Sequence, residues 1–488
     1  MCTVLRLALW AVLAAVGALA QNSSFQGVVT DNSGAVIPGA LIEVTNLNTG
    51  VATNVSTNVA GFYVVPALNP GRYKITCASQ GFAPAERPQL GLEVGQVARV
   101  DFQLNVGTVT EVIEVSAASQ IIQTEQTDVG QVIDSKRILE MPLNGRNYLQ
   151  LAQFTVGVVP SRQLGKGTRQ DGERGGEGGF RAMGMNVAQN NILLDGNDNS
   201  SRNSGGALGF QSQAVKPPVD AVAEFKVVTN NMGAEYGYRA GAKVLVTTKS
   251  GSNDFHGSLY EFLRNDKLDG TNFFANRSGA GKPTYRQNQF GGTIGGPIVR
   301  NRTFFFFSYQ GTRIRLGQSF INSVPSLDVL NGDFSNQPAQ RRNVYDPLTL
   351  SGSGQTAERE QFPDNRIPAS RFDPIALRIA NLYPAPNIQG REHLPNNFFF
   401  SPSDSDDADQ YDMRFDHNFN DTHRFFARYS IRDQFVYQNG ILPEPAIGGT
   451  GPDRRPAGPQ LGVHFEQRLL GDAVQRVSLR VYLLPDRV

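Results

Sequence analysis

The residues with the clearest potential for chemistry lie between positions 195 and 199, where oxygen-bearing side chains alternate along the chain. Asp195, Asn197 and Asn199 have the spacing of the first ligands of an EF-hand calcium loop. Such a loop needs glycine at its sixth position and glutamate at its twelfth, but this sequence has Ser200 and Gly206 there. An EF-hand site is therefore excluded, and the segment is interpreted as a loop.

The other candidate motifs also lack residues that a binding or catalytic site would need. The glycine-rich run 172–179 has no preceding strand pattern and no following Lys-Ser/Thr, so it does not predict a phosphate-binding loop. The five histidines are scattered, without a helical metal-ligand spacing. Cys2 lies in the N-terminal leader, which leaves Cys77 without an intrachain disulfide partner. No plausible Ser-His-Asp order is present, so the sequence indicates no enzyme, no cofactor and no metal site.

The composition favours strands and turns over helices. The 488 residues include 51 glycines, 30 phenylalanines and 14 tyrosines, and only 18% are charged, below the usual quarter. Lys and Arg number 45 against 44 Asp and Glu, which gives a net charge of +1. This balance gives no electrostatic reason to expect nucleic acid as a partner. We therefore predict a mostly β protein.

Residues 1–20 have the organisation of a signal peptide. Arg6 precedes the apolar run Leu7–Leu19, and Ala18-Leu19-Ala20 supplies the small residues that a signal peptidase requires. The run is shorter than the ~20 residues of a membrane-spanning helix. We therefore expect export with cleavage near Ala20, and any membrane domain of the mature chain would have to be a closed β-barrel.

Residues 24–105 predict a small β-sandwich, because short strand patterns alternate with turn signals. The expected strands lie at 26–30, 40–44, 61–65, 72–76 and 98–104. The motifs Gly27-x-Val29-x-Asp31-x-x-Gly34, Gly61-Phe62-Tyr63 and Pro70-Gly71-x-Tyr73 make this unit similar to the carboxypeptidase regulatory-like domain. That resemblance implies a transthyretin-like sandwich, sometimes grouped with carbohydrate-binding modules, and no peptidase activity. Most of its aromatic residues are assigned to the core.

An apolar and acidic stretch, Val109–Val115, follows the sandwich. It could be a linker strand, or a segment that pairs edge-on with a strand of a partner protein through main-chain hydrogen bonds.

Residues 129–250 contain a series of motifs in a fixed order. They lie at 129–134, 139–147, 191–199, 223–227, 231–237 and 244–250. With the preceding sandwich, this order resembles the TonB-dependent outer-membrane receptors of the Oar-like type, from about residue 24 to 435. The resemblance implies that residues 106–253 form a TonB box and a mixed α/β plug domain inside a barrel. It assigns the TonB box, which binds the energy-transducing protein TonB, to Val109, Thr110, Glu111, Val112, Ile113, Glu114 and Val115.

Residues 254–435 predict the first strands of an outer-membrane β-barrel. In 409–419 and 423–432, apolar residues alternate with polar ones, with Phe426 as the exception. The first segment has Tyr411, Met413 and Phe415 on one face, and Gln410, Asp412, Arg414 and Asp416 on the other. A soluble sandwich could alternate in the same way. Connections that run long, short, long, short add independent support for a barrel. The run Phe304–Phe307 is expected to join an aromatic girdle.

The barrel is expected to be incomplete. Transporters of this class resemble ~22-stranded plugged barrels, whereas 235 residues follow Asn253 and show about five strand patterns. Residues 436–488 diverge further, with weak alternation and with Val488 in place of a terminal aromatic residue. We expect a C-terminally truncated or frame-shifted chain or a fragment, and alternatively a short form that pairs with a second chain.

The resemblance implies, as the leading hypothesis, a receptor or transporter in the outer membrane that does not function in transport in this truncated form. Its expected partners are TonB, outer-membrane lipid and an unidentified extracellular ligand, for example a carbohydrate or a peptide. The alternative is a secreted or surface β-sandwich protein for adhesion or carbohydrate binding.

Overall fold

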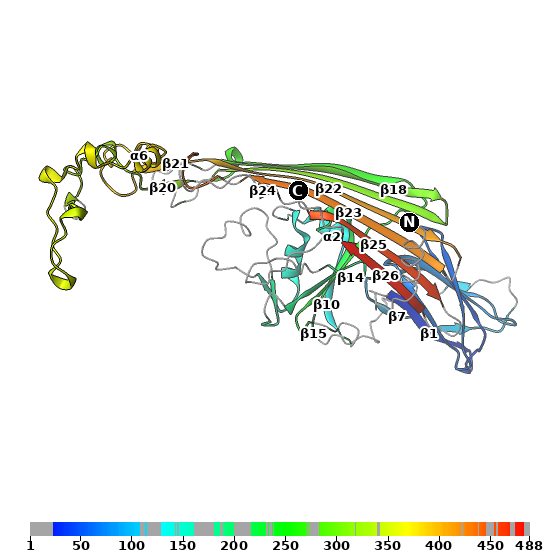
Figure 1. The fold of residues 1–488 in the computed structure, drawn as a ribbon. Coiled ribbons are helices and arrows are strands. Elements are labelled where there is room, and N and C mark those ends of the chain that lie inside the picture. Colours follow the sequence, from blue (N-terminus) through cyan, green and yellow to red (C-terminus); the bar gives the residue numbers. More distant parts are fainter. Residues whose placement is uncertain are drawn as a thin grey trace, which may run out of the picture.

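Three units follow one another along the chain in the computed structural model (Figure 1). Apart from short gaps, the structure describes residues 23–107, 113–114, 128–160, 180–199, 216–270, 282–445 and the strands within 453–482. The expected signal peptide at 1–20 and the glycine-rich run 172–179 lie outside the described residues. No helix in the described part is long and apolar enough to cross a membrane.

The N-terminal unit is a sandwich of two sheets. One sheet contains β1 (Ser23–Asp31), β4 (Phe62–Leu68), β7 (Val97–Arg99) and β8 (Phe102–Leu104). The other has the order β3 (Ala52–Ser56), β2 (Leu41–Asn46), β5 (Gly71–Ala78), β6 (Ala85–Leu92) and β9 (Ile113–Glu114). Both sheets contribute to one core, in which the rings of Phe25 and Tyr73 meet edge to face at 5.7 Å.

All five expected strands of the sandwich are present, and two more were missed. Val100, Phe102 and Leu104 are buried as predicted, although their segment forms two short strands, β7 and β8. The missed strands are β3 and β6, and β6 contains Pro88. The register of β5 with β6 shifts between Tyr73 and Ile75, opposite this proline. A bulge tolerates a residue that cannot donate a ladder hydrogen bond, which explains how proline stands within a paired strand.

Gly27 fills a position of β1 where a side chain has no room. A Cβ there would overlap the backbone carbonyl of Val100, which accepts a hydrogen bond of 2.6 Å from the Tyr63 hydroxyl. We expect Gly27→Ala to destabilise the sandwich by about 2 kcal/mol or more, because a backbone group must move. Gly91→Ala is the matched control, since Gly91 lies in β6 with open space around its Cβ. Urea titration of Cys77 thiol reactivity checks this prediction, and equal midpoints for the two variants would contradict it.

The middle unit is a mixed sheet with short helical segments. Its order is β10 (Val129–Asp134), β15 (Val222–Asn230), β16 (Lys243–Thr248), β13 (Asn191–Leu194) and β14 (Asn197–Asp198), with β13 and β16 parallel. The helix α2 (Ser135–Glu140) begins at Asp134, whose carboxylate accepts a hydrogen bond from the backbone N–H of Arg137. A β-ribbon of β11 (Val158–Pro160) and β12 (Phe180–Ala182) and the 3₁₀ helix η2 (Tyr148–Phe154) complete its core.

The third unit is an antiparallel sheet of long strands that is not closed, here called the long sheet. Its order is β17 (His256–Asn265), β18 (Tyr285–Val299), β19 (Thr303–Gly317), β22 (Ser403–Asn418), β23 (His423–Tyr437), β25 (Ala457–Arg468) and β26 (Val474–Tyr482). The short β24 (Asp453–Arg454) also pairs with β23. The long sheet arches over the middle unit in Figure 1, and the sandwich lies near one end of its strands.

Two expectations about the extent of this sheet were wrong. In the part of the chain that the structure describes, the sheet has eight strands instead of about five, and β25 and β26 lie in the segment 436–488 that was expected to diverge. The sequence pattern did not predict these strands because apolar and polar side chains alternate only weakly there, whereas strand pairing depends on backbone hydrogen bonds.

The two faces of the long sheet differ as the alternation predicts. Gln410, Asp412 and Arg414 are buried on the face toward the middle unit, whereas Tyr411 and Met413 are exposed on the other face. The run Phe304–Phe307 does not lie on one face, as an aromatic girdle made of the whole run would require, because successive side chains of a strand point to opposite faces. Of the run Phe304–Phe307, Phe304 and Phe306 are buried, while Phe305 lies on the opposite face and contacts the ring of Phe255.

The connections between the long strands have the predicted lengths. The connections from β18 to β19 and from β22 to β23 are short and lie at one end, whereas those from β17 to β18 and from β19 to β22 are long and lie at the other. The longest connection, drawn in yellow in Figure 1, projects away from the strands and contains β20 (Phe320–Asn322), α4 (Leu327–Leu330), α6 (Pro374–Ala380) and β21 (Phe398–Phe400). The sandwich contacts the end of the sheet that carries the short turns, through Asn301 and Arg424.

Candidate functional site: the contact between the middle unit and the long sheet

Asp195 is the centre of the contact between the middle unit and the long sheet. It follows β13 at a backbone φ of 47°, in the left-handed region that aspartate tolerates better than most residues. Its backbone N–H donates to the carbonyl of Val246 at 2.8 Å. Its carboxylate accepts hydrogen bonds from the backbone N–H of Thr248 at 2.8 Å and from the Thr248 hydroxyl at 2.9 Å. These bonds fix the carboxylate at the edge of the middle sheet.

Two arginines of the long sheet converge on this carboxylate. Arg414 of β22 places its guanidinium 3.3 Å from Oδ1 of Asp195, and Nε of Arg428 on β23 lies 3.1 Å from Oδ2. All three side chains are at most 5% exposed. Arg414 also donates to the carbonyl and the hydroxyl of Thr248, each at 3.2 Å. One buried carboxylate thereby joins the middle unit to two neighbouring strands.

A second row of polar groups continues the network along the sheet. Arg428 donates to the hydroxyl of Ser430 at 3.0 Å, and this hydroxyl donates to Asp412 at 2.6 Å. Gln410 donates to Asp412 at 2.9 Å and to the carbonyl of Lys216 in the middle unit at 2.7 Å. The network is buried and internally hydrogen-bonded, as groups removed from water must be.

Phe426, the exception to the alternation of β23, contacts the same network through Arg414. The Arg414 guanidinium lies over the Phe426 ring, 4.4 Å from its centroid. A guanidinium on an aromatic face gains a cation–π interaction that strengthens when water is excluded. Arg414 is also paired with Asp416 at 2.9 Å. The aromatic residue on the polar face therefore helps to hold Arg414 in place.

Arg146 makes a second, separate contact with the long sheet. It forms an ion pair with Asp220, and both side chains are at most 9% exposed. Its guanidinium lies 4.0 Å from the ring centroid of Phe262 and 4.8 Å from that of Tyr260, both on β17. The middle unit is thus attached to β17 as well as to β22 and β23.

The segment assigned to the TonB box is only partly described. Ile113 and Glu114 form β9, which pairs in parallel with Ala85 and Glu86 of β6. Val109, Thr110, Glu111, Val112 and Val115 lie outside the described residues. The two described positions are extended and lie at an edge of the sandwich.

The sequence analysis identified Asp195 and Arg414 separately but did not predict that they contact each other. Asp195 was considered as part of a calcium loop and rejected, whereas the structure shows it paired with arginines. Arg414 was placed correctly on the polar face, and Arg428, in the alternating segment 423–432, is buried as well. One sequence feature could have suggested this contact. It is the combination of a carboxylate in a motif of the middle unit with arginines on the inner face of two neighbouring strands. Among the described residues, no group of three or more His, Cys, Asp or Glu side chains could hold a metal ion.

Comparison with known protein families identifies two parts of the chain. Residues 24–105 match the carboxypeptidase regulatory-like domain, and residues 247–465 match an outer membrane beta barrel domain. The second match extends beyond residue 435 into β25, in agreement with the strand pairing.

The chain is also similar to the TonB-dependent transporter Oar of Myxococcus xanthus, with 26% identity over 300 residues, which is 60% of this chain and 27% of that protein. The chain therefore spans about a quarter of the length of this relative. Among solved structures, it resembles the outer membrane transporter YddB of Escherichia coli, with 9% identity, a TM-score of 0.44, and coverage of 70% of this chain and 37% of the other. A ferric enterobactin receptor, PfeA, of Pseudomonas aeruginosa gives 15% identity, a TM-score of 0.37, and coverage of 71% and 40%. These similarities are to transporters and a receptor, and the TonB-dependent transporters are not enzymes.

Proposed function

We propose that this chain, which combines the regulatory-like and barrel domains of the Oar-like TonB-dependent transporters, serves TonB-dependent uptake of an extracellular ligand across the outer membrane. The observation that carries the proposal is the buried attachment of the middle unit to the polar face of the long sheet through Asp195. A soluble sandwich would pack apolar side chains between its layers, whereas here the inner face is polar and the outer face exposes apolar side chains. This distribution suits strands with lipid outside and a plug inside.

The proposal assigns a role to each part of the chain. Residues 1–20 act as a cleaved signal peptide, residues 106–253 contain the TonB box and the plug, and the strands from residue 254 onward form part of the barrel wall. Short turns face the periplasm in such barrels and long connections face outward. The sandwich, which contacts the short-turn end, is then periplasmic, and the long connection 318–402 is extracellular.

Transport requires a closed wall. The long sheet ends at β17 and β26, which do not pair with each other in the described structure. Unpaired strand edges are prohibitively costly in lipid. Uptake is therefore expected only where further strands pair both edges, and the 488 residues as such are expected to bind TonB without transporting.

Binding to TonB tests the assignment of the box directly. The purified full chain is titrated with the periplasmic domain of TonB, and Ile113→Pro is compared with Ile113→Thr. Proline removes a backbone N–H and therefore disrupts strand pairing. Threonine keeps the N–H and can still pair as a strand. We expect the proline variant to bind at least about tenfold more weakly and the threonine variant to bind within about twofold of the unchanged chain. Equal affinities for all three chains would refute the assignment of the box to Val109–Val115.

A further inference from the structure

The sandwich contacts the middle unit through a small apolar patch and a hydrogen bond at Val94. Val94, in the loop between β6 and β7, is buried in a cluster with Val228 and Leu245 of the middle sheet. Its backbone N–H donates to Oε2 of Glu224 at 3.1 Å. The pKa of Glu224 is raised to about 7, mainly by burial; the Val94 hydrogen bond lowers it, and the Glu93 and Asp134 carboxylates raise it.

A second part of the sandwich contacts Asn253, which lies just before β17, and the rim of the long sheet. The loop between β2 and β3 offers the carbonyls of Asn48 and Thr49, which accept from the backbone N–H of Asn253 at 3.0 Å and from its amide side chain at 2.7 Å. Asn253 in turn accepts at 2.8 Å from the backbone N–H of Asn301, in the short turn between β18 and β19. Arg424, at the start of β23, donates to the hydroxyl of Thr53. These bonds tie the sandwich to the rim of the long sheet.

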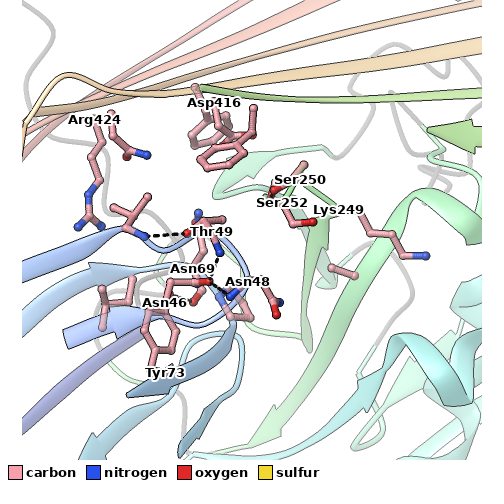
Figure 2. Close-up of a pocket in the computed structure, with 18 of the residues that line it drawn as sticks. Asn46, Asn48, Thr49, Asn69, Tyr73, Lys249, Ser250, Ser252, Asp416 and Arg424 are labelled. Atoms are coloured by element: carbon pink, nitrogen blue, oxygen red, sulfur yellow. Dashed lines mark hydrogen bonds between the residues drawn. The ribbon is translucent and has the colours of Figure 1, made fainter. Parts of the chain in front are cut away.

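A cavity of about 480 Å³ lies beside the second contact and is lined by residues of all three units. Figure 2 shows it between the sandwich loops with Asn46, Asn48 and Thr49, the segment Lys249–Ser252 and the strands that carry Asp416 and Arg424. Much of its lining is polar, so the joint can hold water and differs from the dry core of a single domain. Polar interfaces with little apolar contact are typical of domains that separate.

We propose that the N-terminal sandwich is a reversible clamp that bridges the middle unit and the rim of the long sheet and thereby retains the middle unit in place. The inference rests on the proposed role of that unit as a plug and goes beyond it, because it gives the sandwich a mechanical task. The plug cannot leave the wall without losing either the Val94 contact or the contacts at the rim, which are the Asn301–Asn253 and Arg424–Thr53 hydrogen bonds.

The position of β9 places the clamp in the path of an applied force. Ile113 and Glu114 pair with β6 of the sandwich, and the chain then continues to β10 of the middle unit. A pull on this segment therefore acts on the sandwich as well as on β10. Release of the clamp is expected to precede displacement of the middle unit.

Two buried thiols can report on the two units separately in the full chain. Cys77 lies in the sandwich core, and burial raises its pKa to about 12, so it does not react while the sandwich is folded. Ala152→Cys adds a thiol at a fully buried position in the core of the middle unit. The chain carrying this substitution is titrated with urea in detergent micelles, and maleimide labelling of each cysteine is followed by peptide mass spectrometry.

We compare Val94→Asp and Asn253→Ala with two controls on the exposed surface of the sandwich, Val59→Asp and Asn32→Ala. Each test variant is expected to lower the urea midpoint for labelling at position 152 by roughly half a molar or more, with the Cys77 midpoint unchanged. The controls should leave both midpoints in place. If Val94→Asp also lowers the Cys77 midpoint, Asn253→Ala decides, because it lies outside the sandwich.

An unchanged midpoint at position 152 in Asn253→Ala would overturn the clamp. TonB takes no part in this measurement. The urea titration can therefore support the clamp even if the chain does not bind TonB. Likewise, the chain can bind TonB even if the urea titration overturns the clamp.

Discussion

Replacing Asp195 by alanine is expected to destabilise the attachment of the middle unit by about 3–5 kcal/mol. The substitution leaves Arg414 and Arg428 buried against the middle unit without the carboxylate they share. Thr248 loses the acceptor of its backbone N–H as well. Breaking a buried ion pair from one side costs more than the pair contributes, because the remaining charges stay out of water. Urea titration of labelling at position 152, in the Ala152→Cys background, measures the loss.

The matched control is Asp407→Ala on the same sheet. Asp407 pairs with Arg315, but these side chains are 32% and 44% exposed. Water then solvates the arginine that is left, and the expected cost is at most about 1 kcal/mol. If Asp195→Ala and Asp407→Ala shift the midpoint equally, the Asp195 network does not hold the middle unit.

The features that sequence could predict are those that depend on local pattern. The faces of β22 and β23 followed from a side-chain period of two, since every second residue must share a face. The exception, Phe426, was visible in the sequence, but its reason was not, because the Arg414 guanidinium it supports lies on another strand. Local pattern also missed β6, because proline is unfavourable within a strand and the bulge that accommodates Pro88 depends on the pairing with β5.

The candidate site could not be predicted because its parts are distant in sequence. Asp195 and Arg414 are 219 positions apart, and only the packing of the middle unit against the sheet brings them together. The same holds for the clamp, in which Asn253 meets a loop of the sandwich 204 positions away. Both contacts use polar residues that, in a single sequence, look like ordinary loop or inner-face residues.

Loss of the Arg146 side chain is expected to have the next largest effect. Arg146→Ala leaves Asp220 buried without its ion-pair partner and removes the guanidinium from the rings of Phe262 and Tyr260. We expect a loss of about 3 kcal/mol in the attachment of the middle unit, measured as for Asp195. Arg146→Lys keeps a positive charge but not the planar group that stacks on the rings, so an intermediate loss is expected. A lysine variant as stable as the unchanged chain would show that the charge alone matters.

The double variant Asp195→Ala/Arg146→Ala decides whether the middle unit has two independent attachments. Asp195 contacts β22 and β23, whereas Arg146 contacts β17, at the other side of β18 and β19 in the sheet order. Losses at sites without shared partners add to within about 0.5 kcal/mol. Additive losses would mean that each attachment must be broken in its own step before the unit can move. A double variant no worse than Asp195→Ala alone would mean that the Arg146 contact forms only when the Asp195 network is intact, so that breaking one network releases the whole unit.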